Sequence, residues 1–214
     1  MPPRLLTPFE RPYADQLVAE GTKNTYEYAC FIETATGPVL ELVTDGKDDQ
    51  ANPTQITQDF IDNGGRPILH HNHLSQESLS FADWRGASEK FDEVFAHCAD
   101  GTVYWGRVLD QAKMADILSR ANDVEVEAMT GLFKLLATAD GRGADELSSF
   151  FRKEVVNRAM VLAGVVDYAY AWSADASMPY RRATESAAIG PAGQLGKILN
   201  GFIDQAAEQL APRL

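Results

Sequence analysis

The pattern of apolar residues changes near Gln111, and this change constrains the fold more than any other feature of the chain. Before Gln111, short runs of β-branched and aromatic residues alternate with short helical patterns, which is typical of an α/β arrangement. After it, apolar residues recur at helical spacing to the end of the sequence, apart from loops expected at residues 140–143 and 173–182. We therefore expect an α/β domain over residues 1–110, with a mostly antiparallel sheet flanked by helices, and a C-terminal helical extension over residues 111–214.

A capping box predicts the first helix. Thr7 and Glu10 have the spacing at which each side chain bonds the backbone N–H of the other residue. Pro8 suits the first helical position, where no N–H is needed. The helix should run to about Ala19 and end at Gly21.

The other elements of the N-terminal half follow from apolar periodicity. Two helices are expected, a short one after Asn52 and an amphipathic one from Ser80 through Phe95. A period of two along the first strand places the carboxylate of Glu27 on a face with small and apolar side chains. The candidate strands, the first two forming a hairpin, lie at residues 26–32, 39–44, 66–70 and 102–108.

A long helix is expected over residues 144–172. Its apolar residues recur at intervals of three and four, which predicts a stripe that packs against a core rather than a functional site. The stripe consists of Phe151, Val155, Ala159, Leu162 and Val166.

The composition excludes several classes of partner. Nineteen Lys and Arg against thirty-one Asp and Glu give a net charge of −12. This charge repels phosphate backbones and anionic lipid, so we expect neither nucleic acid nor a membrane surface as a partner. The longest strongly apolar stretch, residues 159–166, is too short to span a bilayer, and the N-terminus lacks the apolar core of a signal peptide. Cys30 and Cys98 form no C-x-x-C motif, which favours a reducing compartment, so we expect a cytoplasmic protein.

Three of the four histidines fall within residues 70–73. If this segment is a strand, His71 and His73 project from the same face and can share one metal ion. Asp83 follows after a loop long enough to fold back and would supply a carboxylate as third ligand. Two histidines, one aspartate and an open fourth position describe a catalytic zinc site, where the pKa of a bound water falls to about 7.

The pattern H-x-H, a short loop and S-x-x-D resembles the signature of the JAMM (MPN+) zinc metalloproteases, here His71-x-His73 and Ser80-x-x-Asp83. The order of elements is similar too, because in that family a strand-borne glutamate precedes the motif, as Glu27 does here, and a helix and a strand follow the aspartate. The resemblance covers roughly the first half of the chain. The sequence departs from the family in the loop between the ligands, where a leucine replaces the usual proline and the gap before the serine is one residue shorter.

This resemblance implies a function and a set of roles. His71, His73 and Asp83 would bind Zn²⁺, and Glu27 would take a proton from the zinc-bound water and pass it to the leaving amine. Ser80 would hydrogen-bond the oxyanion of the tetrahedral intermediate. The protein would then be a hydrolase, a metallopeptidase or isopeptidase acting on a peptide or protein tail, with a ubiquitin-like conjugate as one candidate substrate.

The residues themselves leave alternatives open for the site. Glu33 and Glu41 also lie on the hairpin, and either could replace Glu27 as the base, with Glu33 the stronger rival. Ser80 and Asp83, taken alone, have the spacing of an ordinary helix cap. A closed structural zinc site could instead recruit the pair at residues 97–98, and ligands of these types also accept Fe, Mn or Co.

Two alternatives concern the whole chain. An MPN-like domain that has lost catalysis would be an inert scaffold or protein-binding domain, with a structural metal or none. The helical extension would either position the substrate or form a homo-oligomer.

Overall fold

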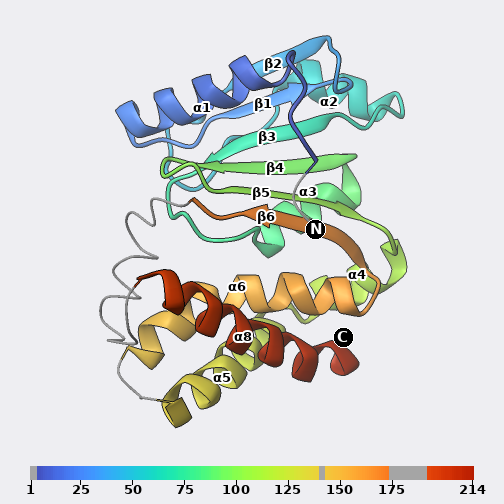
Figure 1. Ribbon diagram of the computed structural model, residues 1–214. Coiled ribbons are helices and arrows are strands. Elements are labelled where there is room, and N and C mark those ends of the chain that lie inside the picture. The colour runs from blue at the N-terminus through green and yellow to red at the C-terminus, as the bar shows by residue number, and fades with distance from the viewer. Residues whose placement is uncertain (1–3, 140–142, 174–191) are drawn as a thin grey trace. The chain divides into compact units, whose positions relative to one another are not determined.

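The computed structural model describes residues 4–139, 143–173 and 192–214, and Figure 1 shows their arrangement into helices and strands. The loops expected at residues 140–143 and 173–182 lie almost entirely outside the described residues. The elements are, in chain order, α1 (Arg11–Asn24), β1 (Ala29–Ile32), β2 (Val39–Val43), α2 (Gln55–Asp62), β3 (Ile68–His73), α3 (Phe81–Glu89), β4 (Glu93–Cys98), β5 (Val103–Val108), α4 (Gln111–Ser119), α5 (Ala121–Ala139), α6 (Ala144–Leu162), β6 (Val166–Ala171), α8 (Ala192–Leu210) and a 3₁₀ turn, η1 (Ala211–Arg213).

The chain divides into two compact units. The first contains residues 1–76, 82–108 and 168–173, and therefore most of the sheet. The second contains residues 77–81, 109–167 and 174–214, and is mainly helical. None of the helices in the described parts of the chain combines the length and apolarity needed to cross a bilayer.

The strands form one six-stranded sheet in the order β2-β1-β3-β4-β5-β6. β1 runs antiparallel to β2 and to β3, and β4 runs antiparallel to β5. β3 and β4 are parallel, with α3 as the crossover between them. The expectation of an α/β protein with a mostly antiparallel sheet is confirmed, as is the hairpin between β1 and β2, and Figure 1 shows the strands side by side.

The helix expected from Ser80 through Phe95 is wrong in its second half. α3 ends at Glu89, and the next residues form β4. Val94, Phe95 and Ala96 are all fully buried, although neighbours in a strand point to opposite faces. A strand buried on both faces has a continuous apolar run rather than an alternating one, so its pattern is easily mistaken for that of a buried helix.

The helix expected over residues 144–172 is also wrong beyond Leu162, where α6 ends. Gly164 adopts a left-handed backbone with a φ of 70°, and the N–H of Val165 bonds back to the carbonyl of Met160. This glycine-based ending stops the helix, and β6 follows and pairs with β5. The region after Gln111 is therefore not wholly helical, because it contributes the last strand of the sheet.

The capping box at the start of the chain is confirmed. The Thr7 N–H donates to Glu10 Oε2 at 2.8 Å, and the Glu10 N–H donates to Thr7 Oγ1 at 3.2 Å. The predicted end is wrong, because α1 runs through Gly21 to Asn24. Gly21 is needed inside the helix for close approach, since a Cβ atom there would lie 2.2 Å from Nδ2 of Asn72 on β3.

Helix α1 covers part of the sheet in the first unit, where it contacts β1, β3 and β4. Its buried Leu17 packs in a cluster with Cys30 and Ile32 of β1. All four residues of β1 are buried, so this strand lies at the centre of the unit. The core of the first unit thus fixes β1 and β3, and these strands carry the candidate site.

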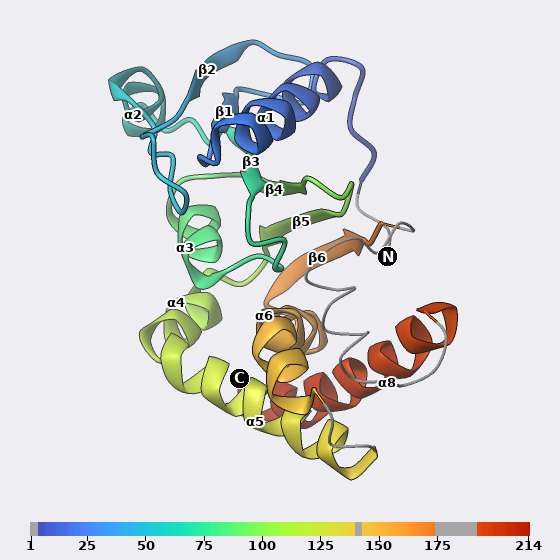
Figure 2. The ribbon, with the colours of Figure 1, turned by 90° about the vertical axis from the view of Figure 1, so that its left-hand side faces the viewer.

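The second unit is built from α5, α6 and α8, which contact one another pairwise. Figure 2 shows the three helices beside one another. Phe151, Val155 and Ala159 of the predicted stripe are buried on α6, as expected. Leu162 is 58% exposed, which contradicts the prediction, because it lies in the last turn before the chain leaves the helix.

Candidate metal centre

Strand β3 places two histidines on one face of the sheet, as predicted. Neighbouring residues of a strand alternate between faces, so His71 and His73 share one face and Asn72 points to the other. In the ladder, His71 lies opposite Ala29 of β1 and Ala96 of β4. Because cross-strand partners share a face, these two small side chains leave space on both sides of the His71 imidazole.

Helix α3 brings Asp83 to the two histidines, since Asp83 lies in its first turn. His71 Nε2 is 3.4 Å from Asp83 Oδ1, and His73 Nε2 is 3.6 Å from Asp83 Oδ2. One potential ligand atom from each of the three residues lies within 4.8 Å of the other two. No second group of this kind occurs in the described parts of the chain.

These distances fit a zinc ion. Zinc bonds to histidine nitrogen and carboxylate oxygen are about 2.0–2.2 Å long, so neighbouring ligands of a tetrahedral site lie about 3.3–3.6 Å apart. His71 Nε2 is also buried and has no hydrogen-bond partner among the described residues, which is costly unless another group satisfies it. Three protein donors leave a fourth position open, as in catalytic sites rather than closed structural ones.

Glu27 lies beside this group, on the other side of the His71 ring. Glu27 Oε1 is 3.0 Å from His71 Nδ1. Because a carboxylate accepts, Nδ1 donates in this contact, and a metal ion would bind at Nε2, on the side of Asp83. This carboxylate–histidine pairing is the usual way in which a metal-binding imidazole is oriented.

The charge around His71 is strongly negative. Burial lowers the pKa of His71, but the charge of Asp83 and the hydrogen bond and charge of Glu27 outweigh burial and raise its pKa above the ordinary 6.5. The same two carboxylates that hold a proton on the imidazole would attract a divalent cation. Metal binding would therefore displace a proton from this site.

The rivals of Glu27 lie elsewhere. Glu41 accepts hydrogen bonds from the N–H and hydroxyl groups of Thr54, at the start of α2. Glu33 follows the last residue of β1, at the end of the strand that pairs with Ile68 rather than with His71. Glu27 precedes β1 at the end next to His71, and its carboxylate lies 3.0 Å from Nδ1 of that candidate ligand.

Ser80 is half-buried and lies directly before α3, three positions ahead of Asp83. It belongs to the short segment 77–81 that groups with the helical unit, whereas the three candidate ligands belong to the first unit. Its suggested contact with an oxyanion stays a prediction.

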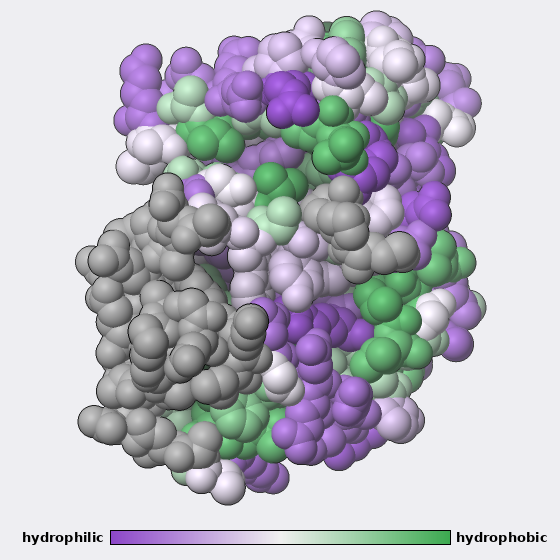
Figure 3. All heavy atoms as spheres, viewed as in Figure 1, coloured by the Kyte–Doolittle hydropathy of each residue, from purple (hydrophilic) through white to green (hydrophobic). Residues whose placement is uncertain are grey.

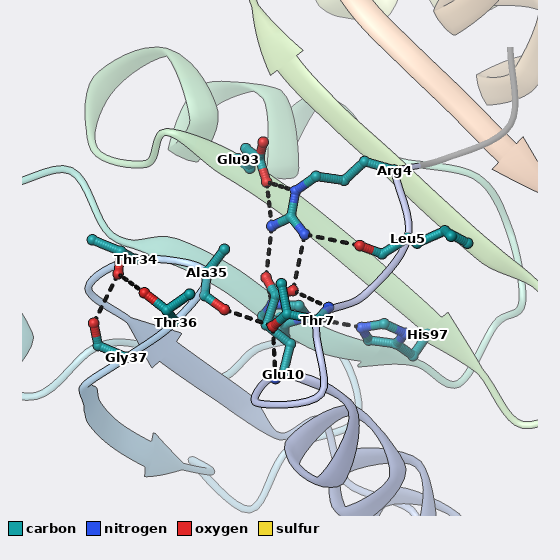
Figure 4. Close-up of polar contacts among 11 residues, drawn as sticks. Arg4, Leu5, Thr7, Glu10, Thr34, Ala35, Thr36, Gly37, Glu93 and His97 are labelled. Atoms are coloured by element: carbon teal, nitrogen blue, oxygen red, sulfur yellow. Dashed lines mark hydrogen bonds and ion pairs between the residues drawn. The ribbon is translucent and has the colours of Figure 1, made fainter.

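A second buried polar network lies next to the site, and the sequence pattern did not reveal it. Glu10 is fully buried, and Figure 4 shows Arg4 between the carboxylates of Glu10 and Glu93. His70 Nε2 is 3.4 Å from Glu10 Oε1, and His70 Nδ1 is 3.1 Å from Nε2 of His97. Apart from Arg4 and Glu10, the partners are remote in sequence, so no local spacing signals the whole network.

The network argues against a closed zinc site at residues 97–98. His97 Nε2 is engaged by His70, and burial lowers the pKa of both histidines. The thiol of Cys98 is buried, and burial together with the charge of Asp100 raises its pKa. Cys30 is buried as well, and burial raises its pKa to about 12, so both thiols behave as small apolar groups, as expected.

Hydrophilic residues cover much of the described surface on the face drawn in Figure 3, with separate groups of hydrophobic residues between them.

Comparison of the chain with family models, curated proteins and solved structures gives no match.

Proposed function

We propose that this protein is a zinc-dependent metallopeptidase or isopeptidase of the JAMM type, acting on an amide bond of a peptide or protein tail. The observation that carries the proposal is that His71, His73 and Asp83 converge at distances suited to one zinc ion. In addition, the carboxylate of Glu27 lies against Nδ1 of His71. Neither the histidine pair nor the aspartate is a strong indication alone. Together they provide three donors and a nearby carboxylate.

Zinc, when bound by these three residues, would polarise the scissile carbonyl and lower the pKa of a water molecule to about 7. Glu27 would accept a proton from that water and pass it to the leaving amine. Oε1 of Glu27 is hydrogen-bonded to His71 Nδ1, so Oε2 is the oxygen that would have to reach this water past the imidazole ring and hold the proton. The side chain of Glu27 is 16% exposed, so it is accessible from solvent while its geometry is held by a buried imidazole.

Ser80 would donate a hydrogen bond to the developing oxyanion, the role that its place in the S-x-x-D pattern suggests. The substrate is proposed by class only. The net charge of −12 favours a protein or peptide with basic surface over nucleic acid, and a ubiquitin-like conjugate is one candidate. Self-association through the helical unit is a further proposal, tested by the oligomeric state of the purified chain.

The first experiment is elemental mass spectrometry of the untagged protein beside the double variant His71→Ala, His73→Ala. We expect about one zinc per chain in the wild type and its loss in the variant. The variant retains His70 and His97, so the loss would assign the zinc to the pair on β3 and not to histidine in general. No zinc in the wild type, even after zinc is supplied, would refute the proposal.

The second experiment tests catalysis on peptide and isopeptide-linked ubiquitin substrates at saturating zinc. Glu27→Gln should lower the turnover by about a hundredfold or more, since it removes the proton acceptor but keeps the shape. Equal activity in the variant and the wild type would remove Glu27 as the base. Bound zinc without turnover of any amide substrate would favour the inert scaffold.

A further inference from the structure

Asn72, the residue between the two histidines, has an unusual set of partners. Its side chain is 3% exposed and lies on the face of β3 opposite to His71. Its Oδ1 accepts a hydrogen bond from the backbone N–H of Tyr28 at 2.7 Å, and its Nδ2 donates to the backbone carbonyl of Tyr26 at 3.2 Å. These two backbone groups flank Glu27 on either side.

The amide orientation of Asn72 is determined by this pairing. A backbone N–H can only donate and a carbonyl can only accept, so the reversed orientation of the amide would lose both bonds. The backbone N–H of Asn72 also donates to the carbonyl of Tyr28 at 3.3 Å. Asn72 therefore extends the pairing between β1 and β3 past the last ladder residue, Ala29, and holds the segment that carries Glu27.

The remaining backbone groups of Glu27 are held from the other side. Its N–H donates to the carbonyl of Lys47 at 2.7 Å, and its carbonyl accepts from Thr44 Oγ1 at 2.7 Å. These two bonds come from the chain after β2, and those of Asn72 come from β3. The backbone around Glu27 is therefore held by hydrogen bonds from two segments, β3 and the chain after β2, although Glu27 lies outside any strand.

Helix α1 leaves space for the side chain of Asn72. The helix passes over Asn72 at Gly21, where a Cβ atom would lie 2.2 Å from Nδ2 and 2.6 Å from Cγ. Glycine inside a helix is destabilising relative to alanine, so its presence here is explained by the close approach of the amide. Gly21 is disfavoured in a helix and Asn72 is a polar side chain in the core. Gly21 leaves the space in which the amide of Asn72 can bond the backbone on either side of Glu27.

We infer that Asn72 is a positioning residue, which sets the carboxylate of Glu27 against His71 Nδ1 and so orients the imidazole toward the metal. This inference rests on the zinc site of the proposed function. It predicts that Asn72 acts through Glu27, and that its effect on zinc disappears when Glu27 can no longer act.

The test is a double-mutant cycle on the zinc dissociation constant, measured by competition with a chelating indicator. Groups that orient a ligand are typically worth about tenfold to a hundredfold in metal affinity. We expect Glu27→Ala and Asn72→Ala each to weaken zinc binding by about tenfold or more, since alanine at position 27 removes the acceptor for His71 Nδ1. In the Glu27→Ala background, Asn72→Ala should change the affinity by less than about twofold, because coupled residues are non-additive. Equal weakening by Asn72→Ala in both backgrounds would overturn the inference.

A second readout does not depend on zinc. In the metal-free protein, ¹⁵N–¹H spectra of the imidazole groups should show a protected Nδ1 proton on His71 that is lost in Glu27→Ala and in Asn72→Ala. If this proton behaves as expected but the wild type binds no zinc, the proposed function fails and the positioning role stands. If zinc binds but the proton persists in Asn72→Ala, the positioning role fails and the proposed function stands.

Two further variants separate the positioning role of Asn72 from a general loss of folding. Should Asn72→Ala alone fold poorly, Gly21→Ala with Asn72→Ala restores packing, because the added methyl group occupies the space that the amide leaves.

The matched control is Asn24→Ala. Asn24 lies in the same region, but its amide donates to the side chains of Glu20 and Tyr28 and not to the backbone groups beside Glu27. It should leave zinc affinity and the His71 proton unchanged, and an effect as large as that of Asn72→Ala would count against the inference.

Discussion

Replacing Glu10 by glutamine is predicted to destabilise the first unit by about 3 kcal/mol at pH 7. Glu10 is fully buried and accepts hydrogen bonds from Arg4 Nη2 at 2.6 Å, Arg4 Nη1 at 2.9 Å and the Thr7 N–H at 2.8 Å. Removing one partner of a buried ion pair typically costs about 3–5 kcal/mol, because the other charge is left uncompensated. The low end applies, since the Arg4 side chain is 27% exposed and keeps its contact with Glu93.

The effect should depend on pH in a defined direction. Burial raises the pKa of Glu10, but the hydrogen bonds from Arg4 and His70 and the Thr7 N–H lower it well below the ordinary 4.5. A depressed pKa contributes stability above the unfolded value, and this contribution is lost as the pH falls toward the folded value. The difference between wild type and variant should thus be constant above about pH 5 and shrink by about 1.4 kcal/mol per pH unit below 4.5, leaving about 1 kcal/mol at pH 3.

Urea unfolding followed by tryptophan fluorescence measures this free energy. All three tryptophans, Trp84, Trp105 and Trp172, lie in the first unit, so the signal reports on the unit that contains Glu10. Glu93→Gln is the matched control, because it leaves the pair of Arg4 and Glu10 in place and should cost about 1 kcal/mol. A loss below about 1 kcal/mol for Glu10→Gln at pH 7, or a difference that does not shrink at pH 3, would refute the reasoning.

Gly21→Ala should lower the free energy of unfolding by about 2 kcal/mol in urea, because the new Cβ displaces Asn72 and costs more than the gain in helix propensity; unchanged stability would show that the amide moves away freely. Cys30 and Cys98 should resist alkylation by iodoacetamide at pH 8 in the folded protein and react in urea, as followed by mass spectrometry, since both thiols are buried with raised pKa values. Zinc should raise the melting temperature of the wild type in a concentration-dependent way, and calorimetry of the variant Asp83→Asn should show a smaller shift at equal zinc.

The elements with local signals were predictable. The capping box of Thr7 and Glu10 and the hairpin of β1 and β2 arise from neighbouring residues, and both are confirmed. Strand β4 was missed because a strand buried on both faces lacks alternation, and β6 was missed because its first residue continues the spacing of the α6 stripe. Gly164 was the available signal for the second error, since it ends the helix two residues before β6.

In the candidate site, too, only the features that depend on local spacing were predictable from the sequence. H-x-H on a strand must place His71 and His73 on one face, so their pairing was predictable from spacing alone. The choice of Glu27 over Glu33 depended on which end of β1 lies against His71, and this is set by the register of the two strands. The roles of Gly21 and Asn72 could not be inferred, because each is explained only by the other, across the packing of α1 on β3.

The sequence by itself determined the α/β class with its mostly antiparallel sheet and the identity of the candidate ligands. These depend on periodicity and residue chemistry, which are properties of the chain as written. The tertiary structure alone decided that Asp83 meets the histidines, that Glu27 forms a hydrogen bond with His71, and that the buried carboxylate of Glu10 lies beside His70 of β3. Such contacts join residues that are not neighbours in the sequence, and they exist only because the packing of α1, β3 and α3 brings them within reach.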